Sequence, residues 1–426
     1  MFATSAACYL HQAQYGIRAP QVAGDAQAYR LWKMISELPP LSDHPTTTEM
    51  LRHLVSFDTT SRNSNLALID FAEAWLRRNR IFTRRCFSPD GAKANLHAII
   101  GPQIQGGLAL SGHVDTVPVD GQAWTSDPFV LRQTDGRLYG RGTCDMKGFV
   151  AACLAAAPDI AAMPLSRPVH LFITYDEETT MAGARRLMDD IAESGLRPDI
   201  CLVGEPSLMQ PILAHKGRIA VKVTVRGSPG HSSEPGRGVN AVHAAAEAVA
   251  YMAAEARRIA RDGPFVDGFD PPYTTAHVGT LAGGTILNII PESAEFVMEW
   301  RFVPGHDADA EFAKFRAYVE QTILPWMHDV DPDTGFSYEV VGFLPGMGLP
   351  EDHALAALVK QTTGSNSTGK VSYGTEGGVY EAAGIPSIVC GPGSIQQAHK
   401  PDEWIEIAQL DACDAFIRSL VARYAT

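Results

Sequence analysis

The sequence predicts a two-domain α/β protein whose principal domain has a mostly parallel sheet. A chain of 426 residues is longer than one ordinary domain. Up to residue 212 apolar strand-like runs alternate with helical segments, as in a sheet covered by helices. From residue 213 the strands instead alternate polar and apolar residues, which is typical of antiparallel strands with one face in solvent. We therefore expect a principal domain formed by residues 46–212 and 343–426, an inserted α+β domain over 213–342, and an N-terminal extension over 1–45.

The principal domain is expected to begin with two helices. Thr46 and Glu49 flank a helix start, because a hydroxyl and an acidic first turn satisfy the free N–H groups there. A second amphipathic helix is predicted from about Asn65 to Asn79. The elements expected after these are strands over 95–100, 108–111, 136–139, 169–175, 200–203 and 386–389, and helices over 149–157, 180–194 and 410–424.

The inserted domain is expected to have a ferredoxin-like order, β-α-β-β-α-β. Its predicted elements are strand 218–225, helix 240–260, strands 277–281 and 294–302, helix 307–324 and strand 336–342. The alternating first strand and the long helix suggest an edge strand and a helix face that pair with a second copy of the chain.

Composition excludes several classes of function. The formal net charge of −13 argues against a nucleic-acid partner, because phosphate binding requires a basic surface. No run approaches the roughly 18 apolar residues of a membrane span, and the N-terminus lacks the early positive charge of a signal peptide. Seven scattered cysteines without a CxxC pair are typical of a reduced, cytoplasmic protein.

The stretch SGHVDTVP, residues 111–118, directly follows an apolar run. Residues two apart on a strand face the same side, so His113 and Asp115 are expected to emerge together at the strand end. This arrangement suits a metal-ligating imidazole that a carboxylate orients. Alone, it fits an ordinary His-x-Asp in a polar loop better than a metal site.

Further candidate ligands follow other predicted turns and strands. Asp145 lies in GRGTCDMKG, whose missing third glycine argues against a dinucleotide loop; Glu177 and Glu178 follow a strand, as does Glu205 in GEP. His399 lies in the late segment GPGSIQQAHKPDEW. Each has a plain alternative, such as an acid at a helix N-terminus or a histidine in a surface loop. Together, two histidines and three carboxylates, one of them bridging, fit two zinc ions, with cobalt or manganese as substitutes.

The chain resembles the acetylornithine deacetylase and succinyl-diaminopimelate desuccinylase family of dizinc amidohydrolases. The resemblance rests on these motifs, on their order along the chain, and on YDEE and GHSSEPGRGVNA. The resemblance covers about residue 47 to the C-terminus and is most continuous from Ser61 through GRGTCDMKG, where the chain looks most like the deacetylase branch. It implies a zinc-peptidase-type fold with an inserted dimerisation domain. It also implies hydrolysis of N2-acetyl-L-ornithine to ornithine and acetate, in arginine biosynthesis. The chain departs from the family pattern at residues 179–182.

The resemblance implies a role for each candidate ligand. Asp145 would bridge two zinc ions. The remaining ligands would be His113 with Glu205 at one ion, and Glu178 with His399 at the other. Asp115 would orient His113, and Glu177 would be the general base for the attacking water. The family also implies a cis peptide bond between Asp145 and Met146.

Substrate contacts are expected from both domains. By resemblance, His231 in GHSS comes from the partner of a homodimer and stabilises the oxyanion. Arg301 is a candidate clamp for the substrate carboxylate, and Asn288 a further contact. The glycine-rich loop with Thr375 and Glu376 is placed in the pocket, with Glu376 contacting a side-chain amine.

Other functions remain open from the sequence. A related deacylase, a desuccinylase or a dipeptidase would use the same metals on another small N-acyl amino acid or peptide. A catalytically silent, metal-stabilised binding protein is a reading from a different class, although such a protein would be expected to lose a ligand or the base. A serine hydrolase is not supported, because the sequence has no G-x-S-x-G motif.

Overall fold

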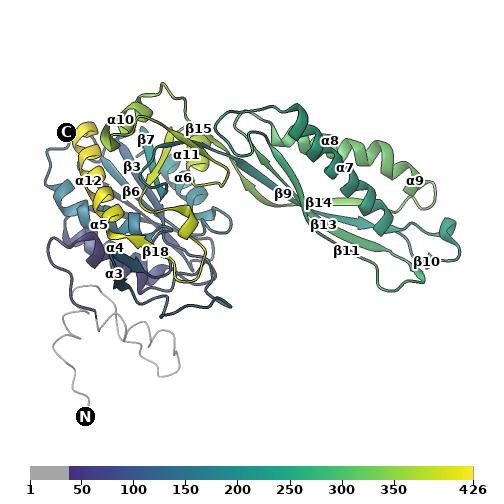
Figure 1. Cartoon of the computed structure of the whole chain (residues 1–426), viewed down its shortest axis with the longest axis horizontal. Helices are drawn as coiled ribbons and strands as arrows, with labels where there is room; N and C mark the ends of the chain where they lie inside the picture. The colour runs from purple at the N-terminus through teal and green to yellow at the C-terminus, as the bar shows by residue number, and fades with distance from the viewer. Residues whose placement is uncertain (1–37, 426) are drawn as a thin grey trace, which may run out of the picture. The chain divides into compact units, whose positions relative to one another are not determined.

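The computed structural model describes residues 38–425, which divide into two compact units (Figure 1). Most of the predicted extension 1–45 lies outside the described residues. The second unit extends a few residues beyond the predicted insert and takes in a short later segment. The first unit comprises residues up to 213, 349–369 and 375 onward; the second comprises 214–348 and 370–374. Within the described part of the chain, no helix has both the length and the apolar character needed to span a bilayer.

The first unit contains most of a mixed sheet that has nine strands among the described residues. The strand order is β1-β2-β6-β3-β7-β17-β8-β15, with β16 beside β8. The central strands β6, β3, β7 and β17 are paired in parallel, whereas the pairs β1–β2, β2–β6, β17–β8 and β8–β15 are antiparallel, so the sheet is less parallel than the sequence suggested. The strands are β1 (Phe82–Phe87), β2 (Ala94–Ile100), β3 (Leu108–His113), β6 (Val169–Thr174), β7 (Ile200–Pro206), β8 (Ile212–His215), β15 (Met347–Gly348), β16 (Gly369–Val371) and β17 (Ser387–Gly391).

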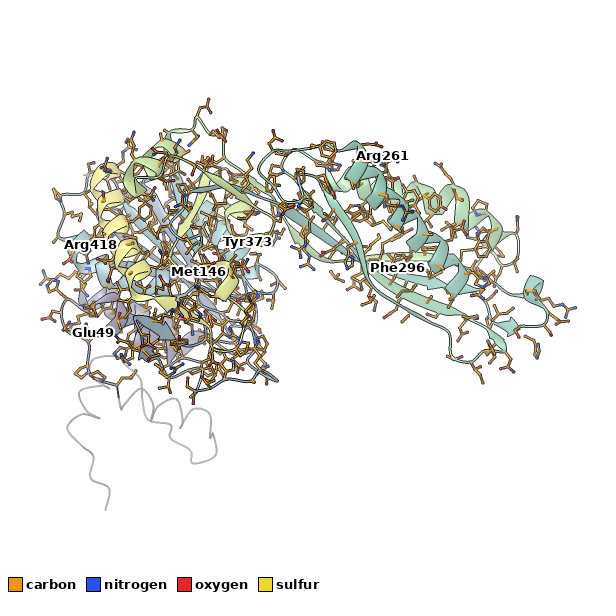
Figure 2. The ribbon with its side chains drawn as sticks, in the orientation of Figure 1. Glu49, Met146, Arg261, Phe296, Tyr373 and Arg418 are labelled. Carbon is orange, nitrogen blue, oxygen red and sulfur yellow. The ribbon has the colours of Figure 1, made fainter. Side chains whose placement is uncertain are left out.

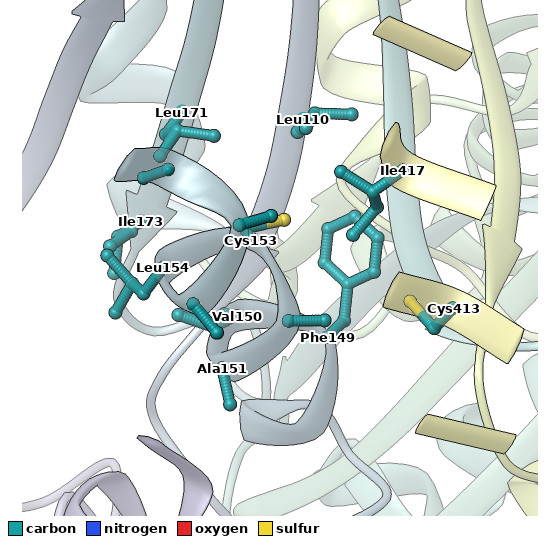
Figure 3. Close-up of a cluster of buried hydrophobic side chains, with 14 of the residues drawn as sticks. Leu110, Phe149, Val150, Ala151, Cys153, Leu154, Leu171, Ile173, Cys413 and Ile417 are labelled. Atoms are coloured by element: carbon teal, nitrogen blue, oxygen red, sulfur yellow. The ribbon is translucent and has the colours of Figure 1, made fainter. Parts of the chain in front are cut away.

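Helices cover both faces of this sheet. Every residue of β2, β3, β6 and β7 is buried, as expected for strands between two helical layers. The Ala-rich helix α5 lies between strands β3 and β6 and helix α12 (Figure 3), which explains why it is apolar all round. The helices of this unit are α3 (Thr47–Val55), α4 (Leu66–Arg78), α5 (Lys147–Ala161), α6 (Ala182–Ser194), α10 (Ala354–Thr363), α11 (Gly377–Ala382) and α12 (Ile407–Tyr424).

The predicted helix start at Thr46 is confirmed, with a capping box between Thr46 and Glu49. The predicted strand at 136–139 is also present, as β5 (Arg137–Tyr139). It belongs to a small separate sheet with β4 (Arg132–Thr134) and β18 (Trp404–Glu406), in the order β18-β5-β4.

The second unit has the ferredoxin-like order predicted from the sequence, with a four-stranded antiparallel sheet ordered β11-β13-β9-β14. Phe296 belongs to the core between this sheet and its helices (Figure 2). The elements are β9 (Gly217–Arg226), β10 (Gly230–His231), α7 (Ala241–Asp262), β11 (Thr275–Gly283), β12 (Ile289–Ile290), β13 (Ser293–Phe302), α8 (Ala308–Tyr318), a π-helical segment (Val319–Ile323), α9 (Leu324–His328) and β14 (Gly335–Leu344).

The predicted position of an edge strand is wrong. The alternating strand β9 pairs with β13 on one side and β14 on the other, so it lies inside the sheet. Its alternation arises because one face packs on the helices while the other face is polar. The edge strands of this sheet are β11 and β14.

Candidate metal centre

The candidate ligands meet where neighbouring strands of the large sheet end. His113 is the last residue of β3, Glu177 and Glu178 follow β6, and Glu205 lies near the end of β7. These strands are parallel neighbours, so their carboxyl ends lie at one edge of the sheet, where sites in α/β folds gather. Position 204, next to Glu205, requires glycine because β7 passes close to α5 there. A Cβ at Gly204 would lie 1.9 Å from the Phe149 ring.

Asp145 is placed between the two histidines. Its Oδ1 is 3.1 Å from His113 Nε2, and its Oδ2 is 3.1 Å from His399 Nε2. The Asp145–Met146 peptide bond is cis, as expected. One carboxylate thus presents a separate oxygen to each of two imidazoles, which is the geometry of a bridging ligand.

Two glutamates complete the groups around these histidines. Glu178 Oε2 is 2.9 Å from His399 Nε2, and Glu205 Oε1 is 3.7 Å from His113 Nε2. The structure therefore brings together all five predicted ligands, in the two groups expected. Glu177 Oε2 is also close, at 3.9 Å from His113 Nε2. Ligand atoms of His113, Glu177 and Glu205 lie within 4.8 Å of one another, so Glu177 could reach a cation as well as a water.

The contacts of His113 direct its Nε2 toward the position that a cation would occupy. Its Nδ1 is 2.9 Å from the backbone carbonyl oxygen of Asp115, a contact in which Nδ1–H donates. Nε2 faces oxygen atoms of Asp145 and Glu205: a protonated ring donates to Asp145 Oδ1 at 3.1 Å, whereas a neutral ring presents a lone pair there. Lone pairs and carboxylate oxygens at these distances repel unless a positive charge lies between them.

A second feature also fits a metal. Glu205 Oε1 is buried and has no hydrogen-bond partner among residues 38–425. A buried carboxylate oxygen without a partner is costly, and a divalent cation would satisfy it. Imidazole and carboxylate ligands without cysteine suit zinc, cobalt or manganese. The residues present therefore fit a two-cation centre.

The pKa values reflect the concentration of acids. Burial and the charge of Glu205 raise the pKa of Glu177 well above its usual value, and burial with the charge of Asp145 raises the pKa of Glu178 to about 7. Burial and Asp145 likewise raise the pKa of Glu205. Hydrogen bonds with Asp145 and Glu178 raise the pKa of His399 to about 10. The site thus favours positive charge, as protons or as metal cations.

The opposite shift is found at the bridging position. Burial disfavours the ionised form of Asp145, but hydrogen bonds from His113 and His399 outweigh burial and lower its pKa. The side chain of His399 is 53% exposed, whereas those of the other four ligands are at most 6% exposed. Solvent therefore reaches the centre from the side of His399.

Asp115 is next to this centre, but its main contacts differ from those expected. Its carboxylate Oδ1 is 3.5 Å from His113 Nδ1, farther than its own carbonyl oxygen. The carboxylate instead accepts the backbone N–H groups of Glu177, at 3.0 Å, and Glu178, at 3.3 Å. Asp115 thus orients His113 mainly through its backbone and the Glu177–Glu178 turn through its side chain.

The substrate contacts expected of Thr375 and Glu376 stay a prediction. Both side chains are fully buried. Glu376 Oε2 accepts hydrogen bonds from the hydroxyls of Tyr380, at 3.0 Å, and Ser111, at 3.3 Å. Glu376 lies at the N-terminus of α11, and its other oxygen, Oε1, is buried without a hydrogen-bond partner among residues 38–425.

The remaining predicted residues lie in the second unit. His231, on β10, is exposed, and its Nδ1 accepts hydrogen bonds from Ser233. Asn288 is exposed and accepts the Ser232 N–H through its backbone carbonyl. Arg301 is 40% exposed and pairs with Glu299, whose other oxygen binds Arg218.

Sequence reasoning missed residues that hold the ligand loops in place. Glu403 accepts three backbone N–H groups of the turn that ends at Asp145, and Lys93 pairs with Asp176, next to Glu177. Glu403 lies four residues after His399 in HKPDEW, so its place in the same motif could have marked it as part of the site. No motif in the sequence marks Lys93 in this way.

The chain is similar to known proteins in both sequence and fold. Residues 109–423 match the model described as "Peptidase family M20/M25/M40". An acetylornithine deacetylase of Yersinia pseudotuberculosis is 36% identical over 396 residues, covering 92% of this chain and 99% of the relative. Among solved structures, aminopeptidase PepT from Bacillus cereus matches with a TM-score of 0.70 at 18% identity, covering 89% of this chain and 98% of that one. A Bacillus subtilis protein described as a dinuclear metal binding peptidase matches with a TM-score of 0.62 at 14% identity, covering 88% and 98%.

Proposed function

The chain belongs to peptidase family M20/M25/M40, and from this premise we propose that it is a dizinc amidohydrolase that deacetylates N2-acetyl-L-ornithine. The observation that carries the metal-dependent chemistry is the placement of the two Asp145 oxygens against His113 and His399. The curated relative named above supports the substrate, because its similarity extends over almost its whole length.

Five side chains would hold the two cations: Asp145 between them, His113 and Glu205 at one, Glu178 and His399 at the other. When bound, such cations supply Lewis acidity toward the amide carbonyl and lower the pKa of water. Among the described residues, the basic groups paired with these carboxylates are the imidazoles of His113 and His399, so bound cations would take the place of their protons.

Glu177 is the proposed base. The attacking water forms a bond from its oxygen to the acyl carbon, and Glu177 takes the proton that the water releases. The C–N bond then breaks, and Glu177 returns that proton to the leaving amine, giving acetate and ornithine. The raised pKa of Glu177 supports this role, because the group must hold a proton between the two transfers.

Residues of the second unit are proposed for substrate and oxyanion contacts. The N–H of Ser233 donates to His231 Nδ1, so the neutral ring carries its proton on Nε2. That Nε2–H is suited to donate to a developing oxyanion, and we propose that it does so in the partner chain of a homodimer. Arg301 and Asn288 are proposed substrate contacts. Buried thiols at the six described cysteines support a cytoplasmic location.

The test is metal analysis of the purified chain, followed by an assay of the same sample with a panel of substrates. We expect two zinc ions per chain and release of acetate from N2-acetyl-L-ornithine, with a higher kcat/KM than for N-succinyl-diaminopimelate, other N-acetyl amino acids or dipeptides. A preference for another member of the panel would keep the chemistry and replace the substrate. Two bound metals with no hydrolysis of any member would favour the silent binding protein.

A further inference from the structure

Glu403 is a buried carboxylate that binds the turn presenting Asp145. Its Oε1 accepts the backbone N–H groups of Cys144, at 2.9 Å, and Asp145, at 3.1 Å. Its Oε2 accepts the backbone N–H of Gly142, at 3.0 Å, and Nη1 of Arg141, at 2.8 Å. Four donors thus converge on two oxygens of a side chain that is 1% exposed.

This arrangement fixes Asp145 through its backbone N–H group, which Glu403 binds. The Asp145 carboxylate faces the two histidines, while the N–H of the same residue faces Glu403. Because three N–H groups of one turn bind the same carboxylate, the turn cannot rotate without losing several charge-assisted hydrogen bonds together. The orientation of Asp145 therefore depends on Glu403.

Arg141 extends the contact to the second histidine. Its Nη2 donates to Gln122 Oε1 at 2.6 Å, and Gln122 Nε2 donates to the backbone carbonyl of His399 at 3.1 Å. The Trp124 indole N–H donates to the same Gln122 oxygen at 3.0 Å and fixes that amide. A continuous chain of hydrogen bonds thus joins the turn of Asp145 to the loop of His399.

Glu403 and Arg141 form a buried ion pair behind Asp145, with Nη1 and Oε2 2.8 Å apart. The charge of Glu403 is therefore compensated while its oxygens also bind the turn. An apolar side chain could fill the space but could not accept the three N–H groups of the ligand turn.

We propose that Glu403 is a positioning residue: it sets the orientation of Asp145 toward both cation positions and, through Arg141 and Gln122, restrains His399. This inference rests on the proposed function, because it requires that Asp145 and His399 bind cations. Glu403 is not one of the five proposed ligands.

The test is Glu403→Gln in the full chain. Glutamine has the same shape, but its NH2 group would face N–H donors at one of the two oxygen positions, so at least one pair of hydrogen bonds is lost. We expect the affinity for Zn2+, measured by competition with a chromophoric chelator, to fall ten- to a hundredfold. The visible absorption of the Co2+-loaded protein should shift as well, because it reports ligand geometry.

Glu73→Gln is the matched control. Glu73 is a buried carboxylate on α4 that accepts hydrogen bonds from Arg85 and Thr83, neither of which contacts a candidate ligand. We expect it to lower the melting temperature of the metal-free protein as much as Glu403→Gln does, with Zn2+ affinity and the Co2+ spectrum unchanged. A merely structural role for Glu403 would make the two variants alike in all three measurements.

The outcomes separate this inference from the proposed function. Wild-type protein that binds two Zn2+ while Glu403→Gln binds them equally well, with the same Co2+ spectrum, would overturn the positioning role alone. Wild-type protein that does not bind two ions would overturn the proposed function and this inference with it. If Glu403→Gln does not fold, Gln122→Ala on the surface loop decides: an unchanged Zn2+ affinity would overturn the link to His399.

Discussion

The carboxylate of Asp115 accepts the backbone N–H of Glu177, with Oδ1 and N 3.0 Å apart. Its Oδ2 accepts the N–H of Glu178 at 3.3 Å and the hydroxyl of Ser61 at 2.8 Å. A residue at the end of β3 therefore fixes the turn that follows β6. Asp115 and Glu403 act alike in this respect, since each binds the backbone of a turn that presents candidate ligands.

The first prediction concerns this contact. Asp115→Asn should lower Zn2+ affinity and kcat together by about ten- to a hundredfold, because its amide NH2 would oppose one of the two N–H groups. Ser61→Ala removes only the hydroxyl contact and should change both quantities by less than about threefold. Metal titration and steady-state kinetics on both variants check this. Equal effects of the two substitutions would argue against the backbone contacts as the reason.

The second prediction separates base from ligand at Glu177. Glu177→Gln should leave two metals bound while kcat falls by about 10²- to 10⁴-fold, because only proton transfer is lost. Glu178→Gln should instead weaken one metal site, since Glu178 Oε2 lies 2.9 Å from His399 Nε2. Metal content after gel filtration and kcat are measured on the same samples. Loss of a metal from Glu177→Gln would make Glu177 a ligand, as its distance to His113 allows.

The local sequence predicted elements whose pattern depends on near neighbours. The capping box at Thr46, the long helix α7 and the ends of β3, β6 and β7 all follow from residues within a few positions of each other. Strand β1 was not predicted, because FTRRCF has no clear alternation and is half exposed on both faces. Its place at the sheet edge depends on pairing with β2, a non-local contact.

Residues of the site were predictable where a motif carries them and not where their contacts are distant. His113, Asp145 and His399 lie in motifs of recognisable chemistry. The contacts of Glu403 to the Asp145 turn span about 260 positions, so the motif named the residue without its role. The burial of Glu376 against Ser111 and Tyr380 is likewise a result of packing, which a glycine-rich loop in a sequence does not indicate.

The third prediction is a pH dependence of stability that arises away from the centre. His170 Nε2 lies 2.9 Å from the Gly106 carbonyl oxygen and donates to it, and His97 Nε2 donates to His170 Nδ1 at 2.9 Å. These two contacts are satisfied when both rings are neutral. Burial, with the neighbouring charge of His170, lowers the pKa of His97 to about 3, and burial lowers the pKa of His170.

The sign of this dependence follows from proton binding. Below pH 6.5 the unfolded chain protonates these histidines, whereas the folded chain resists protonation of His97 down to about pH 3. The contribution is complete above pH 6.5 and is lost as the pH falls, by about 2 kcal/mol for His97 between pH 7.5 and pH 5. Urea unfolding at both pH values should show this loss in wild type and a smaller loss in His97→Gln. Exposed His44→Gln is the control, and a His97→Gln loss equal to that of wild type would contradict the prediction.

The fourth prediction concerns a site shared between two chains. If His231 stabilises the oxyanion in the partner chain, His231→Ala and Glu177→Gln each produce a nearly inactive homodimer. Mixing them with free subunit exchange makes half of the dimers mixed. Each mixed dimer has one site with intact Glu177 and intact His231, so activity should recover to roughly a quarter of wild type. Exchange is verified separately with differently tagged chains.

A control with two substitutions in the same centre distinguishes sharing from nonspecific recovery. Glu177 and Glu178 both lie in the first unit, so mixing Glu177→Gln with Glu178→Gln leaves every site with one substitution. That mixture should stay inactive, because no arrangement of the chains restores an intact centre. Recovery only in the mixture that contains His231→Ala would place the exposed Nε2–H of one chain at the metal centre of the other. An inactive mixture in both cases, with exchange verified, would mean that His231 serves its own chain or takes no part in the reaction.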